Sequence, residues 1–376
     1  MDTVKGADRQ DMAWAWRIAT IAGIPIKIHG TFAVLIIFLL VSGLAGGRGV
    51  TSALSSVLFI LAIFVTIILH ELGHALTARR FGIRTRDITL LPIGGLARLE
   101  RMPDVPRQEL WVALAGPAVN VVIALICFAV LVVTTGEVPV VSLDSSATGF
   151  LGRFTAVNLA LAIFNLLPAF PMDGGRALRA ILAERIDYAR ATEIAASIGQ
   201  GLALVFGLVG LFANPLLVFI ALFVWMGASG EATSASIRSA LAGVPVSRAM
   251  LTDFRTVPAD GSLPDVGQLV LMGSQRDFPV TGADGELVGI LTRDQLMTVL
   301  GTSGHSESVS EAMTTSFEVA DPREMLDGAF RRLQSGACPV IPVIQDGQLV
   351  GLLTAENVAE FMMLQGALGT GGRGTS

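Results

Sequence analysis

The chain has 376 residues, of which 52% are hydrophobic and only 15% are charged, and its formal net charge at pH 7 is −5. Soluble domains carry about 25% charged residues, so this composition indicates an integral membrane protein with room for at least one soluble domain. The acidic balance excludes a strongly basic nucleic-acid binder, and two cysteines exclude a disulfide framework or a cysteine zinc knuckle.

Six apolar stretches approach or reach the length that a membrane span requires, about 20 residues. They are Thr31–Gly46, Ser52–His74, Trp111–Thr134, Gly152–Met172, Ala195–Phe212 and Pro215–Ser229. We therefore predict a polytopic α-helical membrane protein of about six transmembrane helices. The first stretch is interpreted as a retained helix rather than a cleaved signal peptide, because a long polar segment precedes it.

The distribution of arginine predicts the orientation in the membrane. Arginines are frequent after the second and fourth apolar stretches, whereas the loop 135–150 has neither lysine nor arginine. The positive-inside rule then places both termini in the cytoplasm. We expect residues 1–12 to be disordered, residues 13–230 to form the membrane domain, and residues 231–245 to be a linker.

The remaining C-terminal part repeats itself. VSRAM at residues 246–250 recurs as VSEAM at 309–313, and GELVGILT at 285–292 recurs as GQLVGLLT at 347–354. Each copy predicts a strand, an Asp-Gly turn, a second strand and a helix. Because one such unit cannot bury its own sheet, we expect the units 246–302 and 307–364 to pack as an α/β pair. The Gly-rich tail 365–376 is predicted to be disordered.

The sequence HELGH occupies residues 70–74, at the end of the second apolar stretch. On a helix, His70 and His74 share one face and can bind one metal ion, and Glu71 is placed to take a proton from a water molecule there. The alternative is a pair of ordinary helix histidines with a surface glutamate. A charged group at membrane depth costs about 2.5–3.5 kcal/mol without a partner, which favours the metal site.

A catalytic zinc site needs a third protein ligand and an open fourth position. The segment NLLPAFPMDGGR at residues 165–176 offers Asp173, and its two prolines forbid a continuous helix. Broken backbone at membrane depth is tolerated only where it is buried in protein or lines a wet cavity. The predicted topology places Asp173 on the same side as the two histidines. The alternative is that Asp173 only caps the helix that follows it.

HELGH in one apolar stretch and NLLPAFPMDGG in a later one together resemble the site-2 protease family of intramembrane zinc metalloproteases. The C-terminal repeat resembles a pair of cystathionine-β-synthase (CBS) domains. The first resemblance implies one Zn²⁺ per chain, bound by His70, His74 and Asp173, with Glu71 as the general base. It also implies that Asn165 positions substrate or stabilises the transition state through its amide. An interhelical hydrogen bond is the alternative role for Asn165.

These resemblances imply an intramembrane zinc endopeptidase in the cell membrane of a bacterium or archaeon, with cytoplasmic CBS domains. The implied partners are the lipid bilayer, a single-span regulatory substrate such as an anti-sigma factor, and a second copy bound through the CBS domains; no nucleic-acid partner is expected. A transporter or channel is one rival, but it predicts repeated symmetry in the membrane part, which the sequence lacks. An inactive relative that acts as a scaffold is the other.

Two further patterns bear on mechanism. Residues 87–98 predict a β-hairpin beside the site, whose free edge could capture an unwound substrate; an ordinary interfacial loop is the alternative. Paired CBS domains commonly bind adenine nucleotides through a threonine or serine followed three residues later by aspartate. Thr292 and Thr354 match, but Gln295 and Asn357 stand at the aspartate positions. Binding of ATP, ADP or AMP and a purely structural or dimerising role therefore both stay open.

We place two other polar residues outside the predicted site. Asn120 ends the sequence GPAVN in the third apolar stretch, and His29 directly precedes the first stretch. Each has the residue type of a functional group. Asn120 is a weaker candidate for the role given to Asn165. His29 matches a histidine that is common in the family that the chain resembles, and we interpret it as an interfacial residue rather than a ligand.

Overall fold

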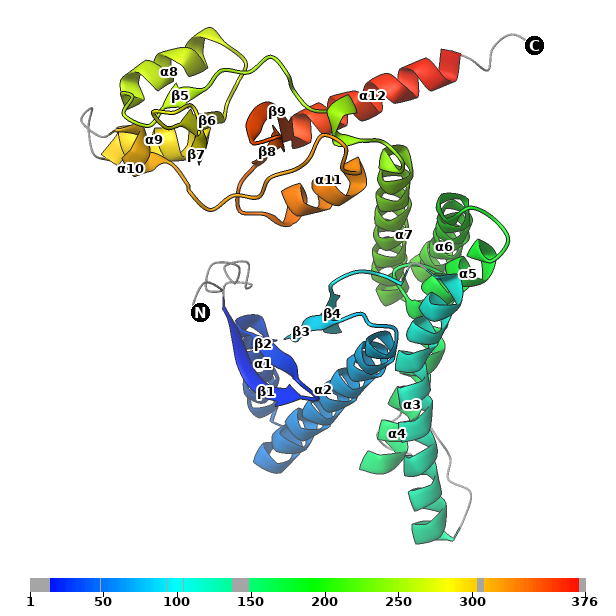
Figure 1. Cartoon of the computed structure of the whole chain (residues 1–376). Helices are drawn as coiled ribbons and strands as arrows, with labels where there is room; N and C mark the ends of the chain where they lie inside the picture. The colour runs from blue at the N-terminus through cyan, green and yellow to red at the C-terminus, as the bar shows by residue number, and fades with distance from the viewer. Residues whose placement is uncertain are drawn as a thin grey trace. The chain divides into compact units, whose positions relative to one another are not determined.

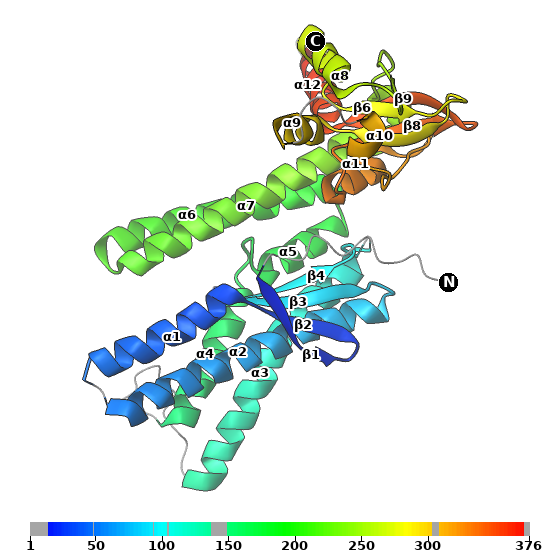
Figure 2. The same ribbon diagram turned by 90° about the vertical axis from the view of Figure 1, so that its left-hand side faces the viewer.

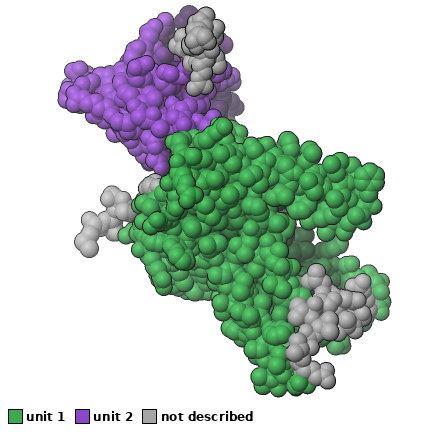
Figure 3. Space-filling view, turned by 90° about the vertical axis from the view of Figure 1, so that its right-hand side faces the viewer, with its two compact units in different colours: residues 1–235 green, residues 236–376 purple. Residues whose placement is uncertain are grey.

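The computed structural model describes residues 14–47, 49–92, 94–103, 105–136, 149–302 and 308–371. The chain divides into two compact units, Met1–Ala235 and Ser236–Ser376 (Figure 1 and Figure 3). The N-terminal segment 1–12, which we predicted to be disordered, lies outside the described residues.

The first unit is mainly helical. Its helices are α1 (Gly30–Ala45), α2 (Gly49–Arg80), α3 (Pro106–Thr135), α4 (Phe150–Asn165), α5 (Asp173–Ala183), α6 (Tyr188–Phe212) and α7 (Pro215–Leu241), the last of which continues into the second unit. Of these, α2, α3, α6 and α7 are long and apolar enough to cross a membrane, whereas α1 and α4 are apolar helices of 16 residues each. The predicted polytopic membrane fold is present, and the number of six spans stays a prediction.

The fourth helix ends earlier than the sequence indicated. The apolar stretch continues to Met172, but α4 stops at Asn165. Pro168 and Pro171 have no amide hydrogen to donate, so the helix cannot continue through them. Two glycines then let the chain fold back closely, because a Cβ on Gly174 would lie 2.2 Å from the carbonyl oxygen of Leu167. The result is a short non-helical connection that ends at α5.

A four-stranded sheet lies along α2 (Figure 2). Its strands are β1 (Ala15–Ile21), β2 (Ile24–His29), β3 (Thr85–Leu91) and β4 (Gly94–Leu99), in the order β1-β2-β3-β4. The central pair β2–β3 is parallel and the outer pairs are antiparallel. The predicted hairpin at residues 87–98 is therefore present as β3 and β4, and β4 is an edge strand.

We did not predict strands β1 and β2. The alternation of Ile24, Ile26 and Ile28 with more polar residues is the period-two pattern that could have revealed β2. Ile24 and Ile26 are buried and pack against Leu72 of α2 and Ile88 of β3. This packing joins the sheet to the helix that carries the HELGH motif.

A buried carboxylate ties three of the strands together. Asp87 on β3 is 3% exposed; its carboxylate accepts two hydrogen bonds from Arg98 on β4, and Lys27 Nζ on β2 lies 3.1 Å from its Oδ2. Burial by itself would raise the pKa of Asp87, but the hydrogen bonds and charges of Arg98 and Lys27 outweigh burial and lower the pKa from its ordinary value. These bonds fix edge strand β4 in register with β3.

The second unit contains both repeats. The first repeat comprises a 3-10 turn (Val246–Arg248), β5 (Val257–Pro258), α8 (Leu263–Met272), β6 (Phe278–Thr281), β7 (Leu287–Leu291) and α9 (Arg293–Thr302). The second comprises α10 (Val309–Ala312), α11 (Leu326–Ser335), β8 (Val340–Gln345), β9 (Gln348–Thr354) and α12 (Ala355–Gly371). α12 thus occupies residues 365–371 of the tail that we predicted to be disordered, and residues 372–376 lie outside the described part.

Each repeat opens with a segment that packs into the core of the other repeat. Val246 and Ala249 pack with residues of the second repeat such as Leu353, whereas Val309 and Ala312 pack with the first repeat. Backbone bridges join Leu251 to Leu352 and Thr314 to Ile290, which makes the exchange reciprocal. The prediction that the two repeats pack as a pair is confirmed, because each core includes a segment of its neighbour.

We predict that Asp87→Asn lowers the free energy of unfolding by about 1–3 kcal/mol at pH 7, because Lys27 and Arg98 lose their charged partner. The folded-state pKa of Asp87 is depressed, so its stabilising contribution is present above its ordinary pKa of 3.8 and is lost as the pH falls through the folded-state value. The measurement is thermal unfolding of both proteins in detergent at a series of pH values.

The control is Glu193→Gln, which removes an exposed pair with Arg190 and should change the unfolding midpoint little. The difference between wild type and Asp87→Asn should shrink below about pH 4. An equal difference at acidic and neutral pH would contradict the role given to the Asp87 charge.

Candidate metal centre

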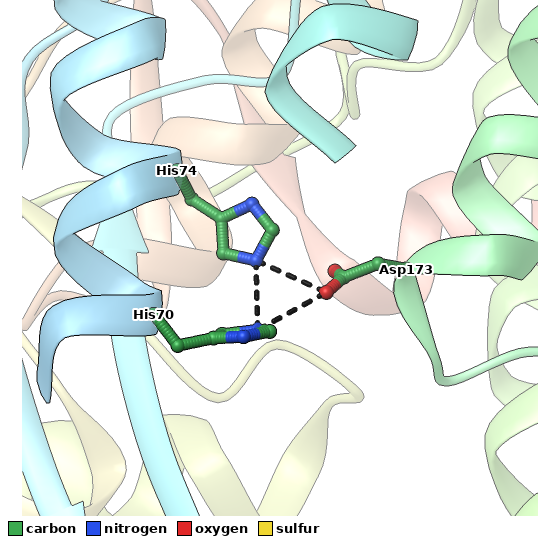
Figure 4. A group of neighbouring side chains, drawn as sticks. All are labelled: His70, His74 and Asp173. Carbon is green, nitrogen blue, oxygen red and sulfur yellow. Dashed lines mark hydrogen bonds and ion pairs between the residues drawn. The ribbon is translucent and has the colours of Figure 1, made fainter. Parts of the chain in front are cut away.

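Three predicted ligands meet in the first unit. The Nε2 atoms of His70 and His74, four residues apart on α2, are 3.1 Å from each other (Figure 4). Asp173 Oδ2 lies 3.2 Å from His70 Nε2 and 3.1 Å from His74 Nε2. All three residues are buried, and among the described residues they are the one group of His, Cys, Asp and Glu side chains close enough to hold a metal ion. Two imidazole nitrogens and a carboxylate oxygen form a ligand set of catalytic zinc sites.

Asp173 does not cap the helix that it begins. The N-cap of α5 is Met172, and no side chain makes a capping hydrogen bond there. The Asp173 carboxylate instead faces the two histidines across the gap between α5 and α2 (Figure 4). The capping alternative is therefore wrong for this residue.

Helix α3 orients both imidazole rings. His70 Nδ1 lies 2.5 Å from Asn120 Oδ1, and His74 Nδ1 lies 2.7 Å from the carbonyl oxygen of Val112. An acceptor at Nδ1 keeps the ring proton there and leaves the Nε2 lone pair for a metal, as in most metal-binding histidines. Asn120 is 1% exposed and contacts a predicted ligand, although its sequence pattern did not place it in the predicted site. Only the packing of α3 against α2 reveals this contact.

A glycine on α3 keeps the space in front of the histidines open. A Cβ on Gly116 would lie 2.2 Å from His74 Nε2 and 2.7 Å from His70 Nε2. A second glycine, Gly73 on α2, lets the helices approach, because its Cβ would lie 2.8 Å from the carbonyl oxygen of Ala115. The ligand types, the ring orientations and this open space all fit a zinc ion.

Glu71 and Asn165 line one pocket together with the three predicted ligands, and this pocket has a volume of about 450 Å³. Glu71 is half-buried on α2, and a Cβ on Gly95 of β4 would lie 2.8 Å from Glu71 Cγ, so the edge strand passes directly beside the predicted base. Asn165 stands at the end of α4, where its Nδ2 donates to the carbonyl oxygen of Leu161 at 2.9 Å. That bond uses one of the two amide hydrogens of Asn165.

The threonines proposed for nucleotide binding lie in the second unit. The Thr292 hydroxyl donates to Gln295 Oε1 at 3.0 Å, and the Thr354 hydroxyl donates to Asn357 Oδ1 at 2.6 Å. The amides at the two aspartate positions are therefore engaged with the neighbouring threonines at the starts of α9 and α12. His29, which we left outside the site, caps α1 by accepting from the Thr31 amide.

Comparison with known proteins places this geometry in a family. The profile of Peptidase family M50 matches residues 58–151 and 140–206, and the CBS-domain profile matches 246–302 and 309–364. A zinc metalloprotease of Methanocaldococcus jannaschii is 32% identical over 356 residues, which are 94% of this chain and 97% of that protein. The chain belongs to peptidase family M50.

A second relative agrees with the M50 assignment. The putative zinc metalloprotease Rip3 of Mycobacterium tuberculosis is 31% identical over 366 residues, covering 93% of this chain and 86% of the relative. A solved structure of the site-2 protease from M. jannaschii is 37% identical, covers 58% of this chain and 95% of its own, and has a TM-score of 0.43. The two family profiles and the two metalloprotease relatives show that the chain is a membrane zinc metalloprotease of the site-2 protease family with tandem CBS domains, which excludes the transporter rival.

We predict that Gly116→Ala abolishes zinc binding, because the added methyl group would overlap the space in front of both Nε2 atoms. The matched control is Gly201→Ala on α6, where a Cβ would meet nothing within 4 Å. Metal content of the purified proteins should be about one zinc per chain in the control and near zero in Gly116→Ala. Full zinc content in Gly116→Ala would show that the metal does not sit between these histidines.

Proposed function

We propose that the chain is an intramembrane zinc endopeptidase that cuts a transmembrane segment of a membrane-anchored regulatory protein. In this proposal His70, His74 and Asp173 bind zinc and Glu71 is the general base. The observation that supports it best is the buried triangle of ligand atoms, which opens onto the same pocket as Glu71 and the edge strand β4. Metal, base and a surface for extended peptide are then within one cavity.

A zinc ion held by His70, His74 and Asp173 would act as a Lewis acid toward the scissile carbonyl group and would lower the pKa of water. Glu71 accepts a proton from the attacking water molecule and later donates a proton to the leaving amine. Asn165 donates its remaining amide hydrogen to the oxyanion that develops on the carbonyl oxygen. Asn120 and the Val112 carbonyl hold the two imidazole rings in the tautomer that this arrangement requires.

Strand β4 binds the substrate in this proposal. A peptide bond within a helix is shielded by the helix's own hydrogen bonds, so a transmembrane substrate must unwind before it is cut. Among the residues that the structure describes, β4 pairs only with β3, which leaves the backbone groups of its other edge for an added strand. Because Gly95 of β4 packs against Glu71, a segment paired with β4 would run past the general base.

The setting that we propose follows from the arginine distribution and the domain composition. We place both termini and the CBS pair in the cytoplasm of a bacterial or archaeal cell, with the membrane domain in the plasma membrane. The substrate is then a single-span protein resembling an anti-sigma factor, and the CBS domains join two chains. Modulation by ATP, ADP or AMP at Thr292 and Thr354 is one role for the pair, and dimerisation alone is the other. Calorimetric titration of the full chain with ATP distinguishes them.

We predict that the purified protein cleaves a model single-span substrate in detergent and that Glu71→Gln lowers the rate by 10²-fold or more, since a general base contributes roughly 10²–10⁴-fold. A zinc chelator should stop the wild-type reaction, and zinc should restore it. Glu71→Gln should still bind one zinc per chain, because Glu71 is not among the three ligands.

Cleavage by Glu71→Gln at the wild-type rate would refute the mechanism. If the wild type binds zinc but cuts none of a panel of single-span substrates, the inactive-scaffold alternative gains support. If the wild type binds no zinc, the ligand assignment itself is wrong.

We also predict that strand addition to β4 can be detected through the substrate backbone. N-methylation of one substrate residue removes a single amide donor and leaves its side chain unchanged. Methylation at alternate residues beside the cleaved bond should raise KM roughly 5- to 10-fold, about the loss of one hydrogen bond, while methylation at the residues between them has little effect. The same KM at every methylated position would argue against capture by a strand edge.

A further inference from the structure

A buried arginine on α5 contacts several elements around the proposed metal site without lining the pocket. Arg179 is 2% exposed, and its Nε donates to Glu109 Oε1 on α3 at 2.9 Å, with a second bond from Nη2 to the same oxygen. Its Nη1 donates to Glu231 Oε2 on α7 at 2.9 Å. The guanidinium carbon also lies 5.0 Å from the ring centroids of Phe170 and Tyr188.

These contacts reach the elements that hold the proposed ligands. Phe170 belongs to the non-helical connection that leads to Asp173, and it is completely buried. Glu109 lies on α3, the helix that supplies Val112, Gly116 and Asn120 to the site. The Arg179–Glu109 pair therefore fastens the helix of the carboxylate ligand to the helix that orients both histidine ligands.

A stripe of α7 packs against the same connection. Val224 is in the cluster of Ala169 and Met172, and Ala228 is in the cluster of Phe170. A Cβ on Gly227 would lie 2.5 Å from Pro171 Cδ, and Glu231 completes the stripe with its bond to Arg179. Residues at this spacing share one face of a helix. The connection therefore packs against α7 on one side, and the ring of its Phe170 contacts the Arg179 guanidinium.

A buried arginine is a costly way to hold helices together if only stability is needed. Replacing a buried ion pair by neutral residues of similar size is often neutral or stabilising, whereas removing one partner leaves a buried charge and is strongly destabilising. The planar guanidinium offers hydrogen bonds in two directions and a face for aromatic rings, which an apolar side chain cannot do. A geometric role explains this residue better than a contribution to stability.

We propose that Arg179 is a positioning residue: it fixes the Asp173 carboxylate relative to His70 and His74 by tying α5 to α3, α7 and the Phe170 ring. This inference rests on the proposed function, because it takes these three residues as the zinc ligands. Loss of Arg179 loosens the Asp173 carboxylate while leaving every ligand in the chain. The expected consequence is weaker zinc binding, comparable to the roughly 10- to 100-fold loss seen when outer partners of metal ligands are removed.

The test separates positioning from stability with a double variant. Arg179→Met alone leaves the buried Glu109 carboxylate without its arginine partner, so it should lower the unfolding midpoint of the zinc-free protein. Arg179→Met with Glu109→Gln replaces both members of the buried pair by neutral side chains; Glu231 keeps access to water because its side chain is 30% exposed. The unfolding midpoint of the double variant should return most of the way to the wild-type value. The control is Arg190→Met, which removes an exposed arginine from α6.

Zinc affinity is measured on the full-length proteins in detergent by competition with a chelator, alongside thermal unfolding without zinc. The double variant should regain stability but bind zinc roughly 10- to 100-fold more weakly than wild type and Arg190→Met. With saturating zinc, its kcat should remain reduced while KM changes little. Wild-type zinc affinity in the double variant would overturn the inference and leave the proposed function intact.

Arg179→Lys is the second variant, for the case that the double variant does not fold. Lysine keeps the charge beside Glu109, but it cannot hydrogen-bond both glutamates in a fork and stack on Phe170 at once. Arg179→Lys should also bind zinc more weakly than wild type. An unchanged zinc affinity would again overturn the inference. Absence of zinc binding in the wild type would refute the proposed function, and this inference with it.

Discussion

The side chains of His70, His74 and Asp173 meet in the buried interior between α2 and α5, and the rest of the site provides hydrogen-bond partners for them. Polar groups at membrane depth need partners, because neither lipid nor apolar side chains can solvate them. The three ligand atoms face one another, and the outer nitrogens of the histidines face Asn120 and the Val112 carbonyl. A metal ion would complete the coordination that these groups begin.

Close approach of helices is the second requirement, and glycine provides it where the site needs it. Gly73 and Gly116 let α2 and α3 come together around the histidines, and Gly174 lets the chain fold back after α4. Prolines in the same connection end α4 before the carboxylate. The carboxylate can therefore approach α2 from a separate short helix, α5, which a continuous fourth helix would not allow.

Two buried ion pairs fix the elements around the pocket relative to one another. Asp87 holds strand β4 in register through Arg98, and Arg179 ties α5 to α3 and α7. Both pairs lie outside the chemistry, and both act on elements that carry residues of the pocket. A protease that hydrolyses a peptide bond needs its base, ligands and substrate strand in fixed relative positions, since small misplacements reduce the rate strongly.

Much of this protein could be predicted from the sequence because the relevant signals are local. The spacing of His70 and His74 places them on one helix face. Pro168 and Pro171 predict that the helix ends before Asp173. The recurrence of GELVGILT as GQLVGLLT identifies the paired repeats. These features depend only on helix periodicity, proline chemistry and duplication, which do not need the tertiary fold.

Other features were decided only when distant segments packed together. The roles of Asn120, Gly116 and Arg179 depend on contacts between α3, α2 and α5, which no local pattern specifies. Strands β1 and β2 were not predicted; β2 pairs in parallel with β3, a strand far along the chain, and no local pattern specifies that pairing. Local periodicity records which face of an element is buried, but the partner on that face is chosen by the three-dimensional packing of the whole unit.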